Sequence, residues 1–134
     1  MNLYNTLLIQ PVGEPGSGKT TLSFWLSQAL KHANIHSEFV PEVVKYECFT
    51  DDGKKRVKSG RFDHRYLSTQ MRMVKPLIGK VEVLINDGCL ELFPLYGKHR
   101  MSWDNWIKLR DRVLEYRKLF SHSWFVIPER KGDY

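Results

Sequence analysis

Several features that would place this chain in a special class of protein are scarce in its sequence. Only two of its 134 residues are cysteines, Cys48 and Cys89, and they form no closely spaced pair. A disulfide framework or a zinc site is therefore not expected, and two separate thiols suit a reducing cytoplasm. No apolar run approaches the about 20 residues that span a membrane, and the N-terminus lacks the basic stretch of a secretory signal. These absences predict a soluble, cytoplasmic protein.

The residues that are present can build one core and attract anions. Apolar residues make up 42% of the chain, which suits a single domain over residues 1–134. Lysine and arginine number 21 against 15 acidic residues, so the net charge is +6. This charge favours anionic partners and fits nucleotides as well as nucleic acid.

Apolar patterning predicts strands and helices in alternation. Short apolar runs predict strands over residues 7–12, 37–40, 81–85 and 124–127. Apolar residues spaced three and four apart predict helices over residues 20–33, 63–80 and 103–120. Pro11 weakens the first strand, and Pro76 is expected to kink or shorten the second helix. Strict alternation predicts an α/β fold of three layers, a parallel sheet with helices on both faces.

Two of these helices carry apolar stripes that we expect to face the core. The stripe of the first helix is Leu22, Trp25, Leu26, Ala29, Leu30 and Ala33. The stripe of the last helix is Trp106, Leu109, Val113, Tyr116 and Phe120. Ser102 is the expected N-cap of the last helix. Trp103 and Trp106 are interpreted as core and helix-anchoring residues rather than as stacking platforms for bases.

The most specific motif is GEPGSGKT at residues 13–20, which matches the phosphate-binding pattern GxxxxGK[ST] in full. It follows an apolar run and opens an amphipathic helix, so backbone amides and a helix N-terminus can face a phosphate. Lys19 would neutralise the β- and γ-phosphates of ATP, and the Thr20 hydroxyl would coordinate Mg²⁺. The residues expected to hold the nucleotide are Gly13, Glu14, Pro15, Gly16, Ser17, Gly18, Lys19, Thr20 and Thr21. The alternative is a chance glycine-rich turn.

Two carboxylates follow predicted strands and complete the candidate site. Asp87 ends the run VEVLIND, where a second ligand to Mg²⁺ is expected, although Asn86-Asp87-Gly88 also reads as a polar turn. Glu42 follows the strand over residues 37–40. It could accept a proton from a substrate hydroxyl or hold a metal-bound water, or it could be a solvated loop residue. The predicted catalytic set is therefore Lys19, Glu42 and Asp87, with Thr20 and Asp87 as metal ligands.

These motifs, taken in order, resemble a known family. The matching pieces are GEPGSGKTTL at 13–22, FVPEVV at 39–44, a helix carrying Gln70, LINDG at 84–88, and Leu92, Pro94 and Tyr96. Over roughly residues 7–97 the chain resembles P-loop kinases and ATPases related to the ribosylnicotinamide kinase domain of NadR, including compact phage-type AAA-like ATPases. The resemblance implies that Lys19 and Thr20 bind ATP and Mg²⁺ and that Glu42 and Asp87 face the reacting phosphate.

The resemblance also implies a sheet order of 2-3-1-4-5 and an arginine-bearing lid after the fourth strand. The printed sequence ends at Tyr134, so we expect a P-loop NTPase fold truncated after its fourth strand, or a reduced member of the family. Arg130 and Lys131 are where a lid would begin.

The segment KKRVKSGR at residues 54–61 holds five basic residues in eight, after the turn-like Asp51-Asp52-Gly53. It is interpreted as a solvated loop, or as a loop that holds an anionic substrate, closes as a lid or contacts a nucleic-acid backbone. None of the five histidines has metal-ligand spacing, and all are interpreted as structural or surface residues.

Three functions remain open at this point. The first is a kinase that transfers the γ-phosphoryl group of ATP, with Mg²⁺, to a nucleoside- or nucleotide-type small molecule. The second is an NTPase or nucleotide-binding switch that acts on a protein or a nucleic acid, supported by the net charge and the basic segment. The third is a non-catalytic domain that binds nucleotide.

Overall fold

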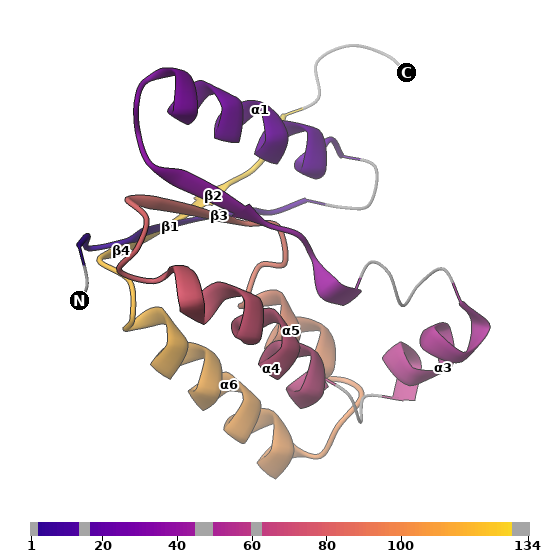
Figure 1. The fold of residues 1–134 in the computed structure, drawn as a ribbon. Coiled ribbons are helices and arrows are strands. Elements are labelled where there is room, and N and C mark those ends of the chain that lie inside the picture. The colour runs from indigo at the N-terminus through magenta and orange to yellow at the C-terminus, as the bar shows by residue number, and fades with distance from the viewer. Residues whose placement is uncertain (1–2, 14–16, 45–49, 60–62, 130–134) are drawn as a thin grey trace.

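The structure is a computed structural model that describes residues 3–13, 17–44, 50–59 and 63–129 (Figure 1). Its centre is a parallel sheet with the strand order β2-β3-β1-β4. The strands are β1 (Leu7–Pro11), β2 (Ser37–Val40), β3 (Val83–Asn86) and β4 (His122–Val126). In register, Leu8 lies opposite Leu84 on one side and Ser123 on the other.

Helices cover both faces of the sheet, as predicted (Figure 1). The helix α1 (Lys19–His32) lies on one face, and α4 (Asp63–Val74), α5 (Leu92–Gly97) and α6 (Trp103–Arg117) lie on the other. The helix α3 (Asp51–Ser59) lies beyond the edge of the sheet at which the strands end, which we call the carboxyl edge. Within the described ranges, no helix is long and apolar enough to cross a bilayer.

The middle of the sheet is buried on both faces because β1 and β3 are apolar except for Gln10 and Asn86. Leu8 and Leu84 join a core cluster with α4 and α6, whereas Ile9 and Ile85 pack with Leu26 and other residues on the α1 side. Successive side chains of a strand point to opposite faces, so neighbouring residues serve different cores. The result is a rigid base beneath the carboxyl edge.

The expectation for Pro76 is confirmed, whereas Pro11 does not interrupt its strand. Pro76 lies in a short 3-10 turn, η1 (Lys75–Leu77), and α4 ends just before it at Val74. Pro11 is part of β1, because the pairing with β3 has already ended at Ile9 and only β4 continues beside it. The missing amide of Pro11 therefore leaves the pairing with β3 intact.

The predicted inner face of α1 is partly wrong. Trp25 is 66% exposed, and Ala29 and Ala33 are exposed as well, whereas Ser23 and Ser27 are buried. The small side chains of Ser23 and Ser27 therefore form part of the inner face of α1, whereas the larger Trp25 lies on its outer face. Leu26 and Leu30 keep the predicted inward position.

Two further expectations need correction. Residues 51–59 form the helix α3, not a turn followed by a loop, although Asp51 and Asp52 stand in its first turn as helix-favouring acids do. Trp103 is 63% exposed and stacks on Trp106, with 5.0 Å between ring centroids, so it is not a core residue.

The short helix α5 was not predicted. The last strand begins two residues earlier than expected, and as the outer strand it leaves Trp124 57% exposed.

The N-cap and the buried stripe of α6 agree with the prediction from the sequence. The Ser102 hydroxyl accepts a hydrogen bond from the Asn105 amide at 3.3 Å, as an N-cap does. Leu109, Val113 and Phe120 are buried. Trp106 is partly buried, and its indole N–H donates to the Pro94 carbonyl at 2.7 Å.

The burial pattern of α6 predicts unequal effects of two leucine substitutions. Leu109 is 0% exposed, and its replacement by alanine should lower the free energy of unfolding by about 2–5 kcal/mol. Leu114 lies on the same helix but is 46% exposed, and the same replacement there should cost about 0.5 kcal/mol. Urea unfolding followed by circular dichroism measures both values. Equal losses would contradict the observed face of α6.

Candidate functional site

Four residues singled out in the sequence meet at the carboxyl edge. Lys19 and Thr20 are the first two residues of α1, Glu42 follows β2, and Asp87 directly follows β3. In a parallel sheet the strand ends share one edge, so residues far apart in the chain become neighbours there. The predicted phosphate loop at residues 13–20 falls between the end of β1 and the first turn of α1 in the chain.

The Thr20 hydroxyl donates a hydrogen bond to Asp87 Oδ2 at 2.9 Å. The Ser23 hydroxyl lies 3.5 Å from the other carboxylate oxygen and donates to the Lys19 carbonyl at 2.9 Å. Asp87 is only 2% exposed, and its backbone amide donates to the Val40 carbonyl at 2.9 Å. Asp87 is thus held by α1 through its side chain and by β2 through its backbone.

The Lys19 ammonium forms an ion pair with the Glu42 carboxylate, with 3.0 Å between Nζ and Oε2. The two side chains are 14% and 27% exposed, so the pair is partly shielded from solvent. A partly buried cation needs an anion beside it. A phosphate oxygen could replace the carboxylate as the partner of Lys19, which would leave Glu42 next to the bound phosphate.

Two glycines in the described part of the predicted phosphate loop stand where a side chain is disfavoured. Gly18 has φ +89°, a left-handed conformation that disfavours any other residue. A side chain at Gly13 would collide with Ser17, whose Oγ is buried and has no partner among the described residues. Thr21 is exposed. Three predicted loop residues lie outside the described residues: Glu14, Pro15 and Gly16.

The start of α1 has backbone amides that lie ahead of the first hydrogen bond of the helix. The first hydrogen bond of the helix runs from the Leu22 amide to the Gly18 carbonyl at 2.9 Å. The amides of the first turn therefore have no carbonyl of their own helix as a partner. Together with the helix dipole, they make this end of α1 attractive to negative charge.

Beneath these charged residues lies a row of buried amide side chains, of which the sequence pattern singled out only Gln70. Gln10, Gln70 and Asn86 are each 0% exposed. The Gln70 Nε2 group donates to Asn86 Oδ1 at 2.8 Å, and the Asn86 amide donates to Gln10 Oε1 at 3.4 Å. The row thus joins α4, β3 and β1 below the candidate site.

The row continues into the segment after β3. Gln10 accepts from the Leu90 amide at 2.9 Å and donates to Glu91 Oε2 at 2.7 Å. Glu91 in turn pairs with Arg117 at the end of α6, at 3.0 Å. The sequence does hold a sign of this row, because two otherwise apolar strands each contain one polar residue: Gln10 in LLIQP and Asn86 in VLIN.

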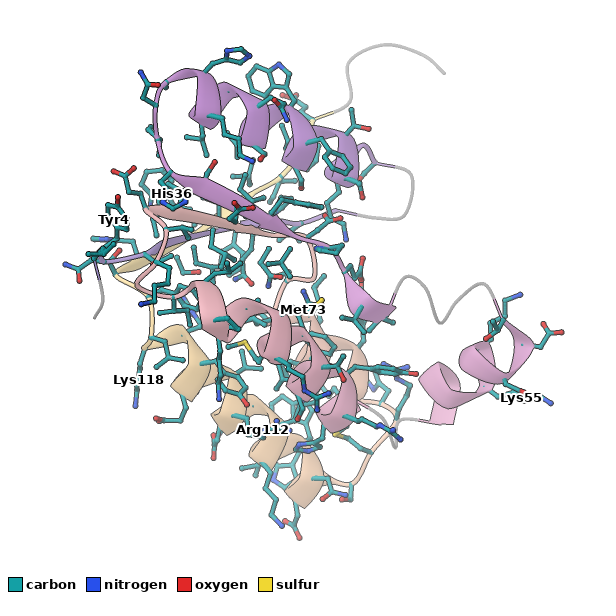
Figure 2. The ribbon with its side chains drawn as sticks, viewed as in Figure 1. Tyr4, His36, Lys55, Met73, Arg112 and Lys118 are labelled. Atoms are coloured by element: carbon teal, nitrogen blue, oxygen red, sulfur yellow. The ribbon has the colours of Figure 1, made fainter. Side chains whose placement is uncertain are left out.

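Two of the histidines have structural partners. The His64 ring lies 2.9 Å from Arg112 Nη1 and 3.1 Å from the Asn105 carbonyl, which ties α4 to α6. The His36 ring packs edge-on against Tyr4 at 6.0 Å. Figure 2 shows Tyr4 and His36 at the edge of the sheet opposite the candidate site, and Arg112 on α6.

Comparisons with known proteins add no assignment. The chain matches no protein-family model, and no curated protein matches it. The case for a function therefore depends on the residues and their geometry.

Cys89 is buried next to the candidate site and should be chemically inert. Burial, together with the nearby Glu91 carboxylate 3.5 Å from Sγ, raises the pKa of the Cys89 thiol from 9.0 to about 12. Only the thiolate reacts with iodoacetamide, and its fraction falls about tenfold for each unit of pKa. In a Cys48→Ser variant at pH 8, Cys89 should react at least about 100-fold more slowly when folded than in urea.

The same pKa difference has a stability consequence of fixed sign. The folded thiol keeps its proton between pH 9 and about 12, whereas the unfolded thiol loses it. The contribution of Cys89 to the free energy of unfolding should therefore be constant below pH 9 and decline above it. A folded-state alkylation rate equal to the rate in urea would contradict this assignment.

Proposed function

We propose that this chain is an ATP-binding protein with a P-loop NTPase fold and that it transfers the γ-phosphoryl group of ATP to a small molecule. The observation that carries the proposal is the meeting of Lys19, Thr20, Glu42 and Asp87 at one sheet edge, with contacts of 3.0 Å and 2.9 Å. A GxxxxGK[ST] motif between a strand and a helix supports it. The order β2-β3-β1-β4 is also compatible with such a fold.

In this proposal the start of α1 and Lys19 hold the phosphates. The backbone amides of residues 17–20 face the phosphate oxygens. The Lys19 ammonium separates from Glu42 and neutralises the β- and γ-phosphates. Since Glu42 is the partner of Lys19 in the structure, a phosphate that replaces it beside Lys19 lies next to Glu42.

Glu42 is the proposed base. An acceptor hydroxyl attacks the γ-phosphorus, and the bond to the β–γ bridging oxygen breaks, so that ADP leaves with the electron pair. The hydroxyl proton passes to the Glu42 carboxylate. The protein contributes position and charge, which supply most of the rate in phosphoryl transfer.

The residues present fit Mg²⁺ bound together with ATP. The Thr20 hydroxyl and the Asp87 carboxylate offer hard oxygen atoms 2.9 Å apart. No group of three or more His, Cys, Asp or Glu residues that could hold a metal occurs in the described part of the chain. Mg²⁺ suits such a sparse site, because it usually keeps water and phosphate oxygens as its other ligands. When bound, the ion supplies positive charge to the phosphates.

A second function, an NTPase that acts on a nucleic acid or a protein, has one observation in its favour. The helix α3, which lies beyond the carboxyl edge (Figure 1), carries four basic residues: Lys54, Lys55, Arg56 and Lys58. Lys54 and Lys55 are exposed, and Figure 2 shows Lys55. A cationic helix there could contact a phosphate backbone. Phosphate release stimulated by a polynucleotide would favour this function, and ADP release that depends on a nucleoside acceptor would favour the kinase.

ATP·Mg²⁺ binding is the first test. Titration calorimetry should detect binding to the wild type, and Lys19→Ala should weaken it by about 1.5–3 kcal/mol, the value of a hydrogen bond to a charged group. Lys31→Ala is the matched control, since Lys31 is an exposed lysine in the last turn of the same helix. A wild type that does not bind, or equal losses in both variants, would refute the proposed site.

Glu42→Gln should separate binding from turnover. The amide cannot accept the proton, so ADP release with a mixture of nucleosides as acceptors should fall by about 10²–10⁴-fold. The dissociation constant for ATP·Mg²⁺ should change little, because Lys19 and the loop still hold the phosphates. Glu38→Gln on β2 is the control and should retain turnover. Undiminished turnover in Glu42→Gln would exclude Glu42 as the base.

A further inference from the structure

The side chain of Gln70 hydrogen-bonds the backbone on both sides of Glu42. Its Nε2 group donates to the Pro41 carbonyl at 3.0 Å, and its Oε1 atom accepts from the Val43 amide at 3.0 Å. Gln70 comes from α4, 28 positions along the chain from Glu42, and is 0% exposed. The backbone that carries Glu42 is therefore tied to a buried residue of a packed helix.

Neighbouring groups determine which way the Gln70 amide faces. Nε2 lies between two acceptors, the Pro41 carbonyl and Asn86 Oδ1, whereas Oε1 faces the Val43 donor. The reverse orientation would place an oxygen against two acceptors and an N–H group against a donor. Asn86 is itself oriented by its donation to the Gly88 carbonyl at 3.0 Å.

Gly88 provides the space that Gln70 occupies. A Cβ atom at this position would lie 2.7 Å from both the Cδ and the Oε1 atoms of Gln70, and 2.9 Å from its Nε2. Such distances are far inside van der Waals contact, so any side chain at position 88 would displace the Gln70 amide. The absence of a side chain at Gly88 thus leaves room for Gln70, which hydrogen-bonds the backbone on both sides of Glu42.

We propose that Gln70 is a positioning residue that determines where the Glu42 carboxylate stands when ATP is bound. This inference depends on the proposed function. Glu42 pairs with Lys19 in the structure, and in the proposed reaction Lys19 turns to the phosphates. The two backbone hydrogen bonds from Gln70 then keep Glu42 within reach of the acceptor hydroxyl. Gln70 acts through Glu42 and does not touch the substrate.

The hydrogen bond to Val43 can be tested in the wild-type protein. The Val43 amide should exchange with deuterium slowly in NMR spectra of the folded protein, because its acceptor is buried. In Gln70→Ala this exchange should accelerate at least about 10-fold, whereas Thr69→Ala, which alters the neighbouring position of α4, should leave it unchanged. Fast exchange in the wild type would overturn the inference even if no variant folds.

The positioning role requires a separation of binding from turnover. Gln70→Ala should lower nucleoside-dependent ADP release by about 10–100-fold, as small misplacements of reacting groups do. Its dissociation constant for ATP·Mg²⁺ should stay within about twofold of the wild type, because the loop at 13–20 is intact. A general loss of structure would weaken binding as well, and that result would overturn the positioning role.

Gly88→Ala provides an independent route to the same effect. It should lower turnover as Gln70→Ala does, and in the double variant the two losses should not add, because both act through the displaced amide. Full additivity would overturn the link between the two residues. A wild type that binds no ATP·Mg²⁺ overturns the proposed function and the catalytic part of this inference, whereas fast Val43 exchange overturns the Gln70 contact itself.

Discussion

The carboxyl end of β3 buries two polar side chains, Asn86 and Asp87, and buried polar groups must find hydrogen-bond partners. Asn86 meets this requirement with Gln70 and Gln10, and Asp87 meets it with Thr20. Their partners come from α4, β1 and α1. One strand end therefore determines how three other elements meet at the candidate site.

The apolar cores and the row of amide side chains contribute to the structure in different ways. The two apolar cores on either side of the sheet supply the burial that stabilises the fold. The amide row sits on the sheet just below the rim, where its hydrogen bonds hold backbone segments in place. The Lys19–Glu42 ion pair stands at the rim, where both side chains are partly exposed and an incoming anion can exchange with the carboxylate.

Much of the architecture was predictable from local patterns. The alternation of apolar runs and helical stripes predicted the parallel sheet and the two covered faces, because burial on both sides requires apolar strands. The positions of Lys19, Thr20, Glu42 and Asp87 at strand or helix ends predicted that they share one edge. The face of α1 was not predictable, since Ser23 lies inward to reach Asp87 while Trp25 points to solvent. Trp103 was likewise interpreted as a core residue, but it is exposed and stacks on Trp106.

The sequence by itself determined the alternation of four strands with three of the helices and the motif at residues 13–20, because these depend on residues that are close along the chain. Only the tertiary structure decided that Gln70 reaches both sides of Glu42 and that Gly88 leaves room for it. These contacts join Gln70 to residues 29, 27 and 18 positions away along the chain. No local preference encodes them, since they arise when buried polar groups from different elements have to satisfy one another.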